Sequence, residues 1–214
     1  MALLFYYITD RRQFPGDRHE QERRLLEKIA ECAAAGVEMI QLREKDLAVR
    51  ALEELGQKAM AALGSSPTRL LINSRTDVAL ACGAHGVHLT ANDMAASDVR
   101  AVFMRAGVSA PVIGVSTHSA AEVASAEAHG ADFAVFAPVF EKAGAASHDG
   151  LEQLRQVCHR SEAAQPPMAV LALGGITVEN AQLCAAAGAA GIAGIRLFQQ
   201  GNVETVVRKL RGSV

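Results

Sequence analysis

The sequence predicts a (β/α)₈ TIM barrel, an α/β fold. Eight short apolar segments alternate with eight segments whose apolar residues recur at helical spacing. The short segments are continuously apolar, which is typical of parallel strands that are covered on both faces. Eight such units of about 25 residues each leave no room for a second domain, so a closed barrel is favoured over an open doubly wound sheet. We expect one barrel domain over residues 1–214.

Each expected element rests on its own apolar pattern. The expected strands are Phe5–Thr9, Met39–Arg43, Leu70–Asn73, Gly86–Leu89, Val112–Ser116, Phe133–Pro138, Ala169–Leu173 and Gly191–Ile195. The expected helices are Glu20–Ala35, Arg50–Leu63, Thr76–Cys82, Ser97–Arg105, Ala120–His129, Leu151–Arg160, Val178–Ala187 and Val203–Leu210. Glycine follows four of these helices, at 36, 83, 130 and 188, as expected for a left-handed cap repeated in successive βα units.

The overall charge and the spacing of the cysteines argue against a nucleic-acid-binding or membrane protein and against a disulfide or cysteine-metal framework. A formal net charge of −2 gives no reason to expect a nucleic-acid or membrane partner. The four cysteines lie far apart without a C-x-x-C spacing, so we expect buried free thiols rather than disulfides or metal ligands. The sequence shows no signal pattern and no run of 18 apolar residues, and we expect a cytoplasmic protein.

The stretch 168–199 predicts a phosphate site. Gly174 and Gly175 follow one expected strand, and Gly194, Ile195 and Arg196 lie at the end of the next. Glycines at strand ends let backbone N–H groups approach an anion, and the loops after the last two strands of a barrel often bind phosphate. A lone Gly-Gly pair would favour a simple tight turn, but Gly194 and the strand count favour the phosphate site.

Polar residues gather at the carboxyl ends of the other expected strands. Gln41, Arg43 and Lys45 alternate, so all three can point into the barrel mouth, where an anion would hold the two cations together. An internal salt bridge of Arg43 is the alternative. Asp93 could hold Mg²⁺ or pair with Lys45. His118 could exchange protons, although on its own a structural role near a helix start is favoured.

These motifs resemble the thiamine phosphate synthase/TenI family over nearly the whole chain. The matching segments lie at 7–10, 41–47, 71–75 with 77–80, 86–89, 113–118, 130–133, 138–140 and 172–177. The resemblance implies a (β/α)₈ barrel that acts in thiamin biosynthesis. Synthase members join an aminopyrimidine diphosphate to a thiazole phosphate and release pyrophosphate, whereas TenI members convert a thiazole carboxylate phosphate to its aromatic tautomer.

The resemblance also implies roles for single residues. Gln41, Arg43 and Lys45 would face the pyrimidine diphosphate, and Asn73 would help to hold that diphosphate. Residues with further implied roles are Asp93 as an Mg²⁺ ligand, Ser116 at the pyrimidine, Gly175 at the thiazole phosphate, and His118, which matches the proton-transferring histidine of TenI members.

Three positions depart from the synthase pattern. Ser74 stands where a second metal-binding acid is usual, the residues after the sixth strand lack the Thr-x-Thr-Lys loop, and Arg196 replaces a serine. Lys142 could partly substitute for the missing loop lysine. A tautomerase needs only phosphate binding, a cation for the substrate carboxylate and one proton shuttle, which Arg43 or Arg196 and His118 could supply.

On these grounds we expect a TenI-type thiazole tautomerase. Thiamine phosphate synthase is the alternative, and a non-catalytic module that binds thiazole phosphate or thiamin phosphate is a third. Mg²⁺ is expected only for a synthase, and weakly without ligand because of Ser74. We also expect a mobile lid over Glu141–Asp149. A homodimer would agree with the family.

Overall fold

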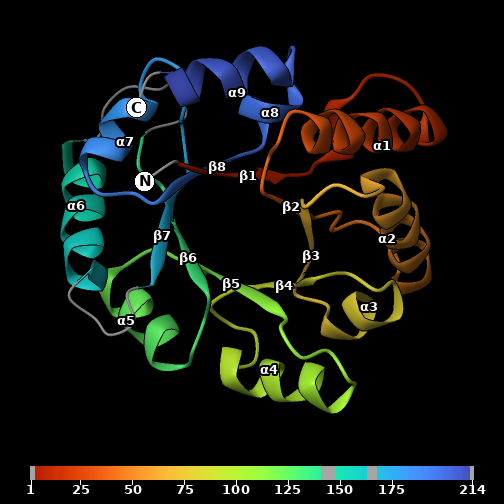
Figure 1. Cartoon of the computed structure of the whole chain (residues 1–214), viewed down its shortest axis with the longest axis horizontal. Coiled ribbons are helices and arrows are strands. Elements are labelled where there is room, and N and C mark those ends of the chain that lie inside the picture. The colour runs from red at the N-terminus through yellow and green to blue at the C-terminus, as the bar shows by residue number, and fades with distance from the viewer. Residues whose placement is uncertain (1–2, 141–147, 163–167, 213–214) are drawn as a thin grey trace.

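Eight parallel strands close a barrel in the computed structural model, which describes residues 3–140, 148–162 and 168–212 (Figure 1). The strands are β1 (Leu4–Ile8), β2 (Met39–Leu42), β3 (Arg69–Asn73), β4 (Gly86–Leu89), β5 (Val112–Thr117), β6 (Phe133–Phe136), β7 (Ala169–Ala172) and β8 (Gly191–Gly194). Each strand pairs with its neighbours in sequence, and β1 pairs with β8 through Leu4 opposite Gly191. The predicted fold class is therefore confirmed.

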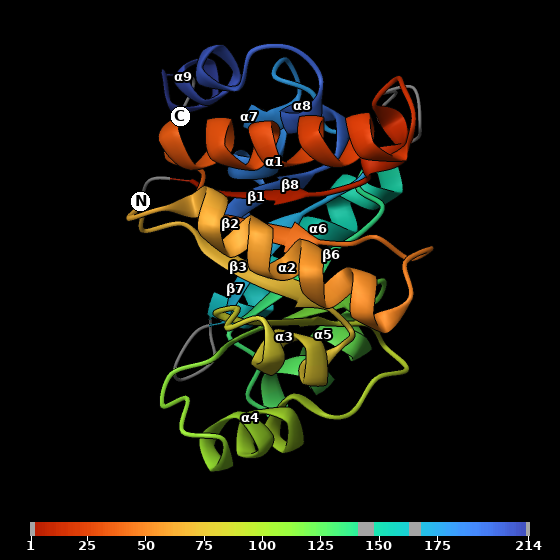
Figure 2. The same cartoon turned by 90° about the vertical axis from the view of Figure 1, so that its right-hand side faces the viewer.

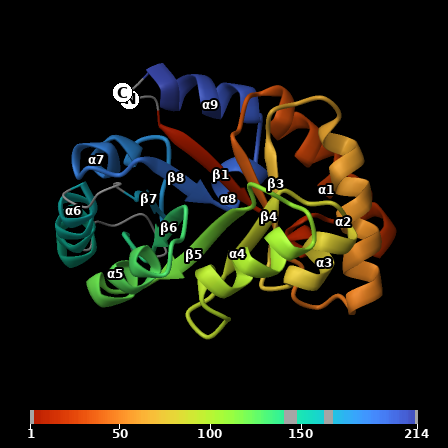
Figure 3. The same ribbon diagram turned by 60° about the horizontal axis from the view of Figure 1, so that its bottom comes forward.

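Helices surround this barrel on its outer side (Figure 1). They are α1 (Arg18–Ala34), α2 (Val49–Leu63), α3 (Thr76–Ala81), α4 (Ala96–Arg105), α5 (Ala120–Ala128), α6 (His148–Glu162), α7 (Ala181–Ala186), α8 (Arg196–Gln199) and α9 (Val203–Gly212), with a short 3₁₀ helix η1 (Arg11–Gln13) after β1. Figure 2 shows α1 and α2 side by side over the first strands, and Figure 3 shows α4, α5 and α6 along the outside of the strands that follow.

Sequence explains where several helices begin and end. The Asp17 side chain accepts a hydrogen bond from the Glu20 amide at the start of α1, and Ser119 does the same for Glu122 at the start of α5. Gly36, Gly83, Gly130 and Gly188 all have positive φ just beyond helix ends. The predicted glycine caps are therefore confirmed.

The barrel interior is filled by the side chains of alternate strand residues. Its apolar members are Tyr6, Ile8, Met39, Leu71, Phe133, Val135, Leu171 and Ala193. Phe133 is nearly fully buried and needs the space left by Gly114, because a Cβ on Gly114 would lie 2.3 Å from the end of the Phe133 ring. Phe133 also packs edge-on against Tyr6, with ring centroids 5.3 Å apart. A close-packed interior leaves ligands only the mouth of the barrel.

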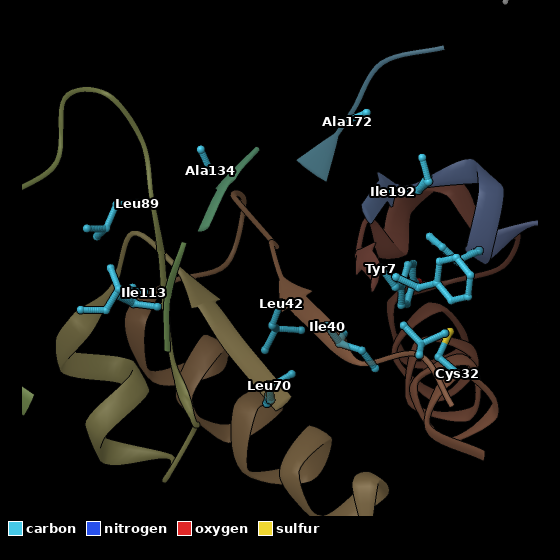
Figure 4. Close-up of a cluster of buried hydrophobic side chains, with 14 of the residues drawn as sticks. Tyr7, Cys32, Ile40, Leu42, Leu70, Leu89, Ile113, Ala134, Ala172 and Ile192 are labelled. Atoms are coloured by element: carbon cyan, nitrogen blue, oxygen red, sulfur yellow. The ribbon is translucent and has the colours of Figure 1, made fainter. Parts of the chain in front are cut away.

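A second, larger apolar layer lies between the strands and the helices. Figure 4 shows part of it, with Tyr7, Ile40, Leu70 and Ile192 from four strands and Cys32 from α1. Small and aliphatic side chains dominate this layer, as expected for a chain without tryptophan. All four cysteines are buried free thiols, as predicted.

The structure corrects several element boundaries near the mouth and adds two short helices there. Helix α7 begins at Ala181 instead of Val178, because the Asn180 side chain bonds to the preceding loop. Strand β8 ends at Gly194, and the unpredicted helix α8 follows. The unpredicted 3₁₀ helix η1 follows β1, and α6 begins at His148, so the end of the predicted lid is helical. The rest of that lid, residues 141–147 with Lys142, lies outside the described residues.

No helix among the described residues is both long enough and apolar enough to cross a membrane.

Candidate active site

A cavity of about 580 Å³ opens where β7 and β8 end. Its lining residues are Leu173, Gly174, Gly175, Ile176, Thr177, Val178, Glu179, Ala193, Gly194, Ile195, Arg196, Leu197 and Gln200. The structure thus brings together all five residues for which the sequence predicts phosphate binding in the last two loops. Arg196 is exposed at the rim and begins α8, so a cation stands beside the glycine loop.

The β7–α7 loop has a backbone that only glycine adopts readily. Gly174 has φ +103° and Gly175 has φ +61°. A Cβ on Gly174 would lie 2.9 Å from the Cα atom of Pro138, so the loop also packs closely against the end of β6. Asn180 holds the loop, since its side-chain amide donates to the Gly175 carbonyl at 3.0 Å and its oxygen accepts from the Thr177 amide at 2.8 Å.

A second polar cluster runs across the ends of β2, β3 and β4. The Gln41 amide donates to Asn73 Oδ1 at 3.0 Å, and the Asn73 amide donates to the Ser74 hydroxyl oxygen at 3.1 Å. The Ser74 hydroxyl in turn donates to Asp93 Oδ2 at 2.8 Å. Ser74 has φ +59°, which is unusual for a residue other than glycine and is found most often at functional sites. The chain of hydrogen bonds joins three residues for which the sequence predicts ligand contacts.

Asp93 is the only acid in this cluster, and one of its oxygens is already used. Asp93 Oδ2 also accepts from the Thr90 amide at 2.6 Å and the Thr90 hydroxyl at 2.9 Å. Among the described residues no group of three potential metal-binding side chains occurs, and Asp93 forms no ion pair with Lys45. Mg²⁺ is commonly bound by one or two carboxylates together with substrate phosphates. Asp93 therefore offers a single carboxylate as an Mg²⁺ ligand.

His88 lies below this cluster, inside the barrel. Its Nδ1 is 3.1 Å from the Tyr6 hydroxyl and its Nε2 is 2.8 Å from Ser116 Oγ. Burial, with a smaller contribution from nearby Arg43, lowers the pKa of His88 to about 3, while Asp93 opposes that change. The imidazole is therefore neutral at physiological pH, and it fixes the position of the Ser116 hydroxyl at the mouth.

Arg43 and Lys45 follow β2 but do not share one environment. Arg43 is partly buried, and its charge lies close enough to His88 to contribute to the lowered pKa of the imidazole. Lys45 is exposed in a turn, because β2 ends at Leu42 and the strand alternation does not continue that far. Neither cation forms an ion pair among the described residues, so the alternative of an internal salt bridge for Arg43 finds no support there.

His118 lies at the end of β5 with its side chain exposed. Its Nδ1 is 2.7 Å from the Ala137 carbonyl oxygen. A carbonyl only accepts hydrogen bonds, so Nδ1 carries the hydrogen and Nε2 of the neutral ring presents a lone pair. His118 is thus suited to accept a proton, whereas its backbone amide donates to Glu122 at 2.6 Å.

Comparison with known proteins decides the family. The family model described as thiamine monophosphate synthase matches residues 5–198. The chain belongs to the thiamine monophosphate synthase family. It is 36% identical to the thiamine-phosphate synthase of Syntrophomonas wolfei, over 96% of this chain and 93% of that protein. It is 35% identical to the thiamine-phosphate synthase of Methanoregula boonei, over 99% and 93%. Like these relatives, it is an enzyme.

A solved structure agrees with this assignment. The thiamine phosphate pyrophosphorylase of Pyrococcus furiosus superposes with a TM-score of 0.79 at 30% identity, covering 99% of this chain and 95% of that one. A 3-hexulose-6-phosphate synthase superposes with a TM-score of 0.66 at 14% identity, which shows a shared fold alone. The names of the relatives favour a synthase over the tautomerase that the sequence departures led us to expect.

Sequence reasoning missed several residues that hold this family site in place. The His88 side chain bonds to residues of two other strands, and the Asn180 side chain bonds to earlier residues of its own loop. No motif in the sequence reveals either set of partners. Arg11 and Glu44 are buried together, although both belong to charged stretches that look exposed. The one feature of the sequence that could have indicated this contact is that Arg11 and Glu44 directly follow two neighbouring strands.

Proposed function

We propose that this enzyme is a thiamine phosphate synthase that joins an aminopyrimidine diphosphate to a thiazole phosphate. The observation that supports the proposal is that two separate groups of residues at one barrel mouth are each suited to bind an anion. The glycine loops of β7 and β8 suit a single phosphate. The polar cluster of Gln41, Asn73, Ser74 and Asp93, together with Arg43 directly after β2, suits a diphosphate. A tautomerase acts on one phosphorylated substrate and has no use for the second region.

The reaction exchanges one bond for another. The bond between the pyrimidine methylene carbon and the diphosphate oxygen breaks, pyrophosphate leaves, and the thiazole nitrogen forms a bond to that carbon. Arg43 and Lys45 neutralise the negative charge that grows on the leaving group. Backbone N–H groups of Gly174 and Gly175 hold the thiazole phosphate, and Gln41 and Ser116 orient the pyrimidine. Mg²⁺, held by Asp93 together with the diphosphate, would supply further charge neutralisation.

The test is pyrophosphate release. Purified protein with both substrates and Mg²⁺ should release pyrophosphate and form thiamine phosphate in equal amounts. Arg43→Met should lower kcat/KM by at least about 100-fold, equivalent to about 2.7 kcal/mol of lost transition-state stabilisation. Arg69→Met is the matched control, because Arg69 is exposed at the opposite end of the barrel, on β3, and this variant should keep wild-type activity.

The tautomerase remains the second candidate, on the observation that His118 presents Nε2 as a proton acceptor. His118→Asn should reduce synthase turnover less than tenfold, since the proposed reaction assigns His118 no proton transfer. Conversion of a thiazole carboxylate phosphate to its aromatic tautomer, without pyrophosphate release from the synthase substrates, would contradict our proposal. Tight binding of thiazole phosphate without any turnover would instead indicate the non-catalytic module.

A further inference from the structure

A buried ionic network lies directly beside the loop that carries Arg43 and Lys45. Arg11, in η1, has a side chain that is only 4% exposed. Its guanidinium donates to Glu44 Oε2 at 2.9 Å, to Asp46 Oδ1 at 2.8 Å and to Asp46 Oδ2 at 2.7 Å. The hydrogen bonds from Arg11 lower the pKa of Asp46 to about 2. One arginine after β1 therefore holds two residues of the loop after β2.

Glu44 is the centre of this network, and its side chain is 1% exposed. It accepts hydrogen bonds from the Thr9 hydroxyl at 2.7 Å and from the Arg11 amide at 3.2 Å. The Thr9 hydroxyl oxygen in turn accepts from the Arg43 amide at 2.9 Å. Burial raises the pKa of Glu44, and the hydrogen bonds from Thr9 and Arg11 oppose that rise. The position of the Arg43 backbone thus depends on a carboxylate that Arg11 neutralises.

The geometry points to Arg11 as a positioning residue for substrate binding. We propose that Arg11, through Glu44, Asp46 and Thr9, fixes the backbone from which Arg43 and Lys45 reach the diphosphate. The identity of that ligand rests on the function proposed above, whereas the fixing of the loop does not. Removal of the guanidinium would leave Glu44 buried without its counter-charge, and the loop would open to hydrate it.

The same strand offers a matched control at its other end. Glu38, just before β2, accepts from the Phe5 amide at 2.8 Å and from Arg211 at 3.1 Å. Glu38 and Glu44 therefore both connect the β1 and β2 segments, and each pairs with an arginine. Only the pair of Glu44 with Arg11 lies at the mouth. Arg211→Met removes such a pair without touching the loop after β2.

The experiment compares Arg11→Met, Arg11→Lys and Arg211→Met. Hydrogen exchange of the amides in Arg43–Leu47 should be at least tenfold faster in Arg11→Met than in wild type, and unchanged in Arg211→Met. The KM for the pyrimidine diphosphate should rise about tenfold, while the KM for the thiazole phosphate should stay within twofold. Arg11→Lys keeps one charge but cannot reach both carboxylates, and it should lie between wild type and Arg11→Met.

The outcomes separate this inference from the proposed function. Wild-type exchange and an unchanged ratio of the two KM values in folded Arg11→Met would overturn the inference. If the wild-type protein releases no pyrophosphate, the proposed function fails, and exchange of the loop amides alone then decides for or against the role of Arg11. If Arg11→Met does not fold, the double variant Arg11→Met/Glu44→Gln, which buries no unpaired charge, takes its place in the same measurements.

Discussion

Ser74 is the residue at which this chain departs most clearly from the metal site of its family. Its hydroxyl donates to Asp93, at the position where the family resemblance implies a second carboxylate, and its positive φ is a conformation that aspartate tolerates better than most residues. Because Asp93 alone supplies a carboxylate, we expect 10 mM Mg²⁺ to stabilise the wild-type protein by less than about 0.5 kcal/mol in the absence of substrate.

The variant Ser74→Asp should reverse this behaviour. Without metal it should lose about 1 kcal/mol of stability, the order expected for two like charges ~4 Å apart in a water-like medium. With Mg²⁺ at tenfold its Kd, the variant should regain about 1.4 kcal/mol. Thermal unfolding with and without Mg²⁺ measures both effects. Ser109→Asp adds the same charge at an exposed site and should show neither; equal Mg²⁺ responses in the two variants would refute this account of Asp93.

The β7–α7 loop is the element on which the proposed phosphate binding depends. Backbone donors cannot be removed by trimming a side chain, so the test must block access to them. Gly175→Val places a branched side chain at φ +61°, where the phosphate oxygens would lie. Affinity for a phosphorylated thiazole should fall at least about tenfold, which corresponds to the loss of one charge-assisted hydrogen bond of roughly 1.5 kcal/mol.

The control for this loop is Gly130→Val. Gly130 also has a positive φ, +72°, but it follows α5 at the other end of the barrel, and a Cβ at this position would meet no atom within 4 Å. The variant carries a comparable backbone strain without blocking the cavity. Isothermal titration should show weaker binding of the phosphorylated thiazole in Gly175→Val only, and similar affinities of both variants for the unphosphorylated alcohol. Unchanged phosphate affinity in folded Gly175→Val would place the phosphate elsewhere.

For the whole molecule, His88 links stability to pH. Its pKa is about 3 in the folded chain and roughly 6.5 when unfolded. Between these values the unfolded chain binds one more proton, so stability is fully present above pH 6.5 and is lost as the pH falls toward 3. Acidification from pH 7 to pH 4.5 should therefore cost on the order of a few kcal/mol of stability.

His88→Gln removes this titration and should flatten the pH dependence of unfolding in that range. Urea unfolding at several pH values from 7 to 4.5 measures the slope. His19→Gln serves as the control because His19 is exposed, and it should keep the wild-type slope. A wild-type slope in His88→Gln would show that the pKa of His88 is the same in the folded and the unfolded chain.

The fold could be predicted because periodicity is a local property. Each strand is an apolar run of about the right length, and glycines 36, 83, 130 and 188 mark repeated helix ends. The cavity at the ends of β7 and β8 could be predicted for the same reason, since Gly174, Gly175 and Gly194 stand at the ends of consecutive strands. The boundary of α7 could not, because it depends on hydrogen bonds that Asn180 makes with its own loop.

The candidate site could be predicted only in part, because contacts between residues far apart in the sequence determine its arrangement. The pattern Gln41, Arg43 and Lys45 predicted three side chains on one face of a strand, but β2 ends at Leu42 and Lys45 lies in an exposed turn. Glu44 and Arg11 are 33 positions apart, and their burial depends on the closure of β1 against β2. The departures at Ser74 and Arg196 are visible in the sequence and led to the prediction of a tautomerase. The names of the relatives favour a synthase, so these two residues alone do not distinguish the two activities.

Gly114 and Phe133 share one volume at the centre of the barrel, and this constrains how the interior can vary. A methyl group at Gly114 would occupy space that the Phe133 ring already fills, and such overpacking typically costs about 1–3 kcal/mol. The Phe133 ring also supports Tyr6 and packs near His88, with ring centroids 6.1 Å apart. A larger residue at position 114 is therefore compatible with this barrel only when position 133 becomes smaller, and the two positions should change together among proteins that keep the same floor beneath the mouth.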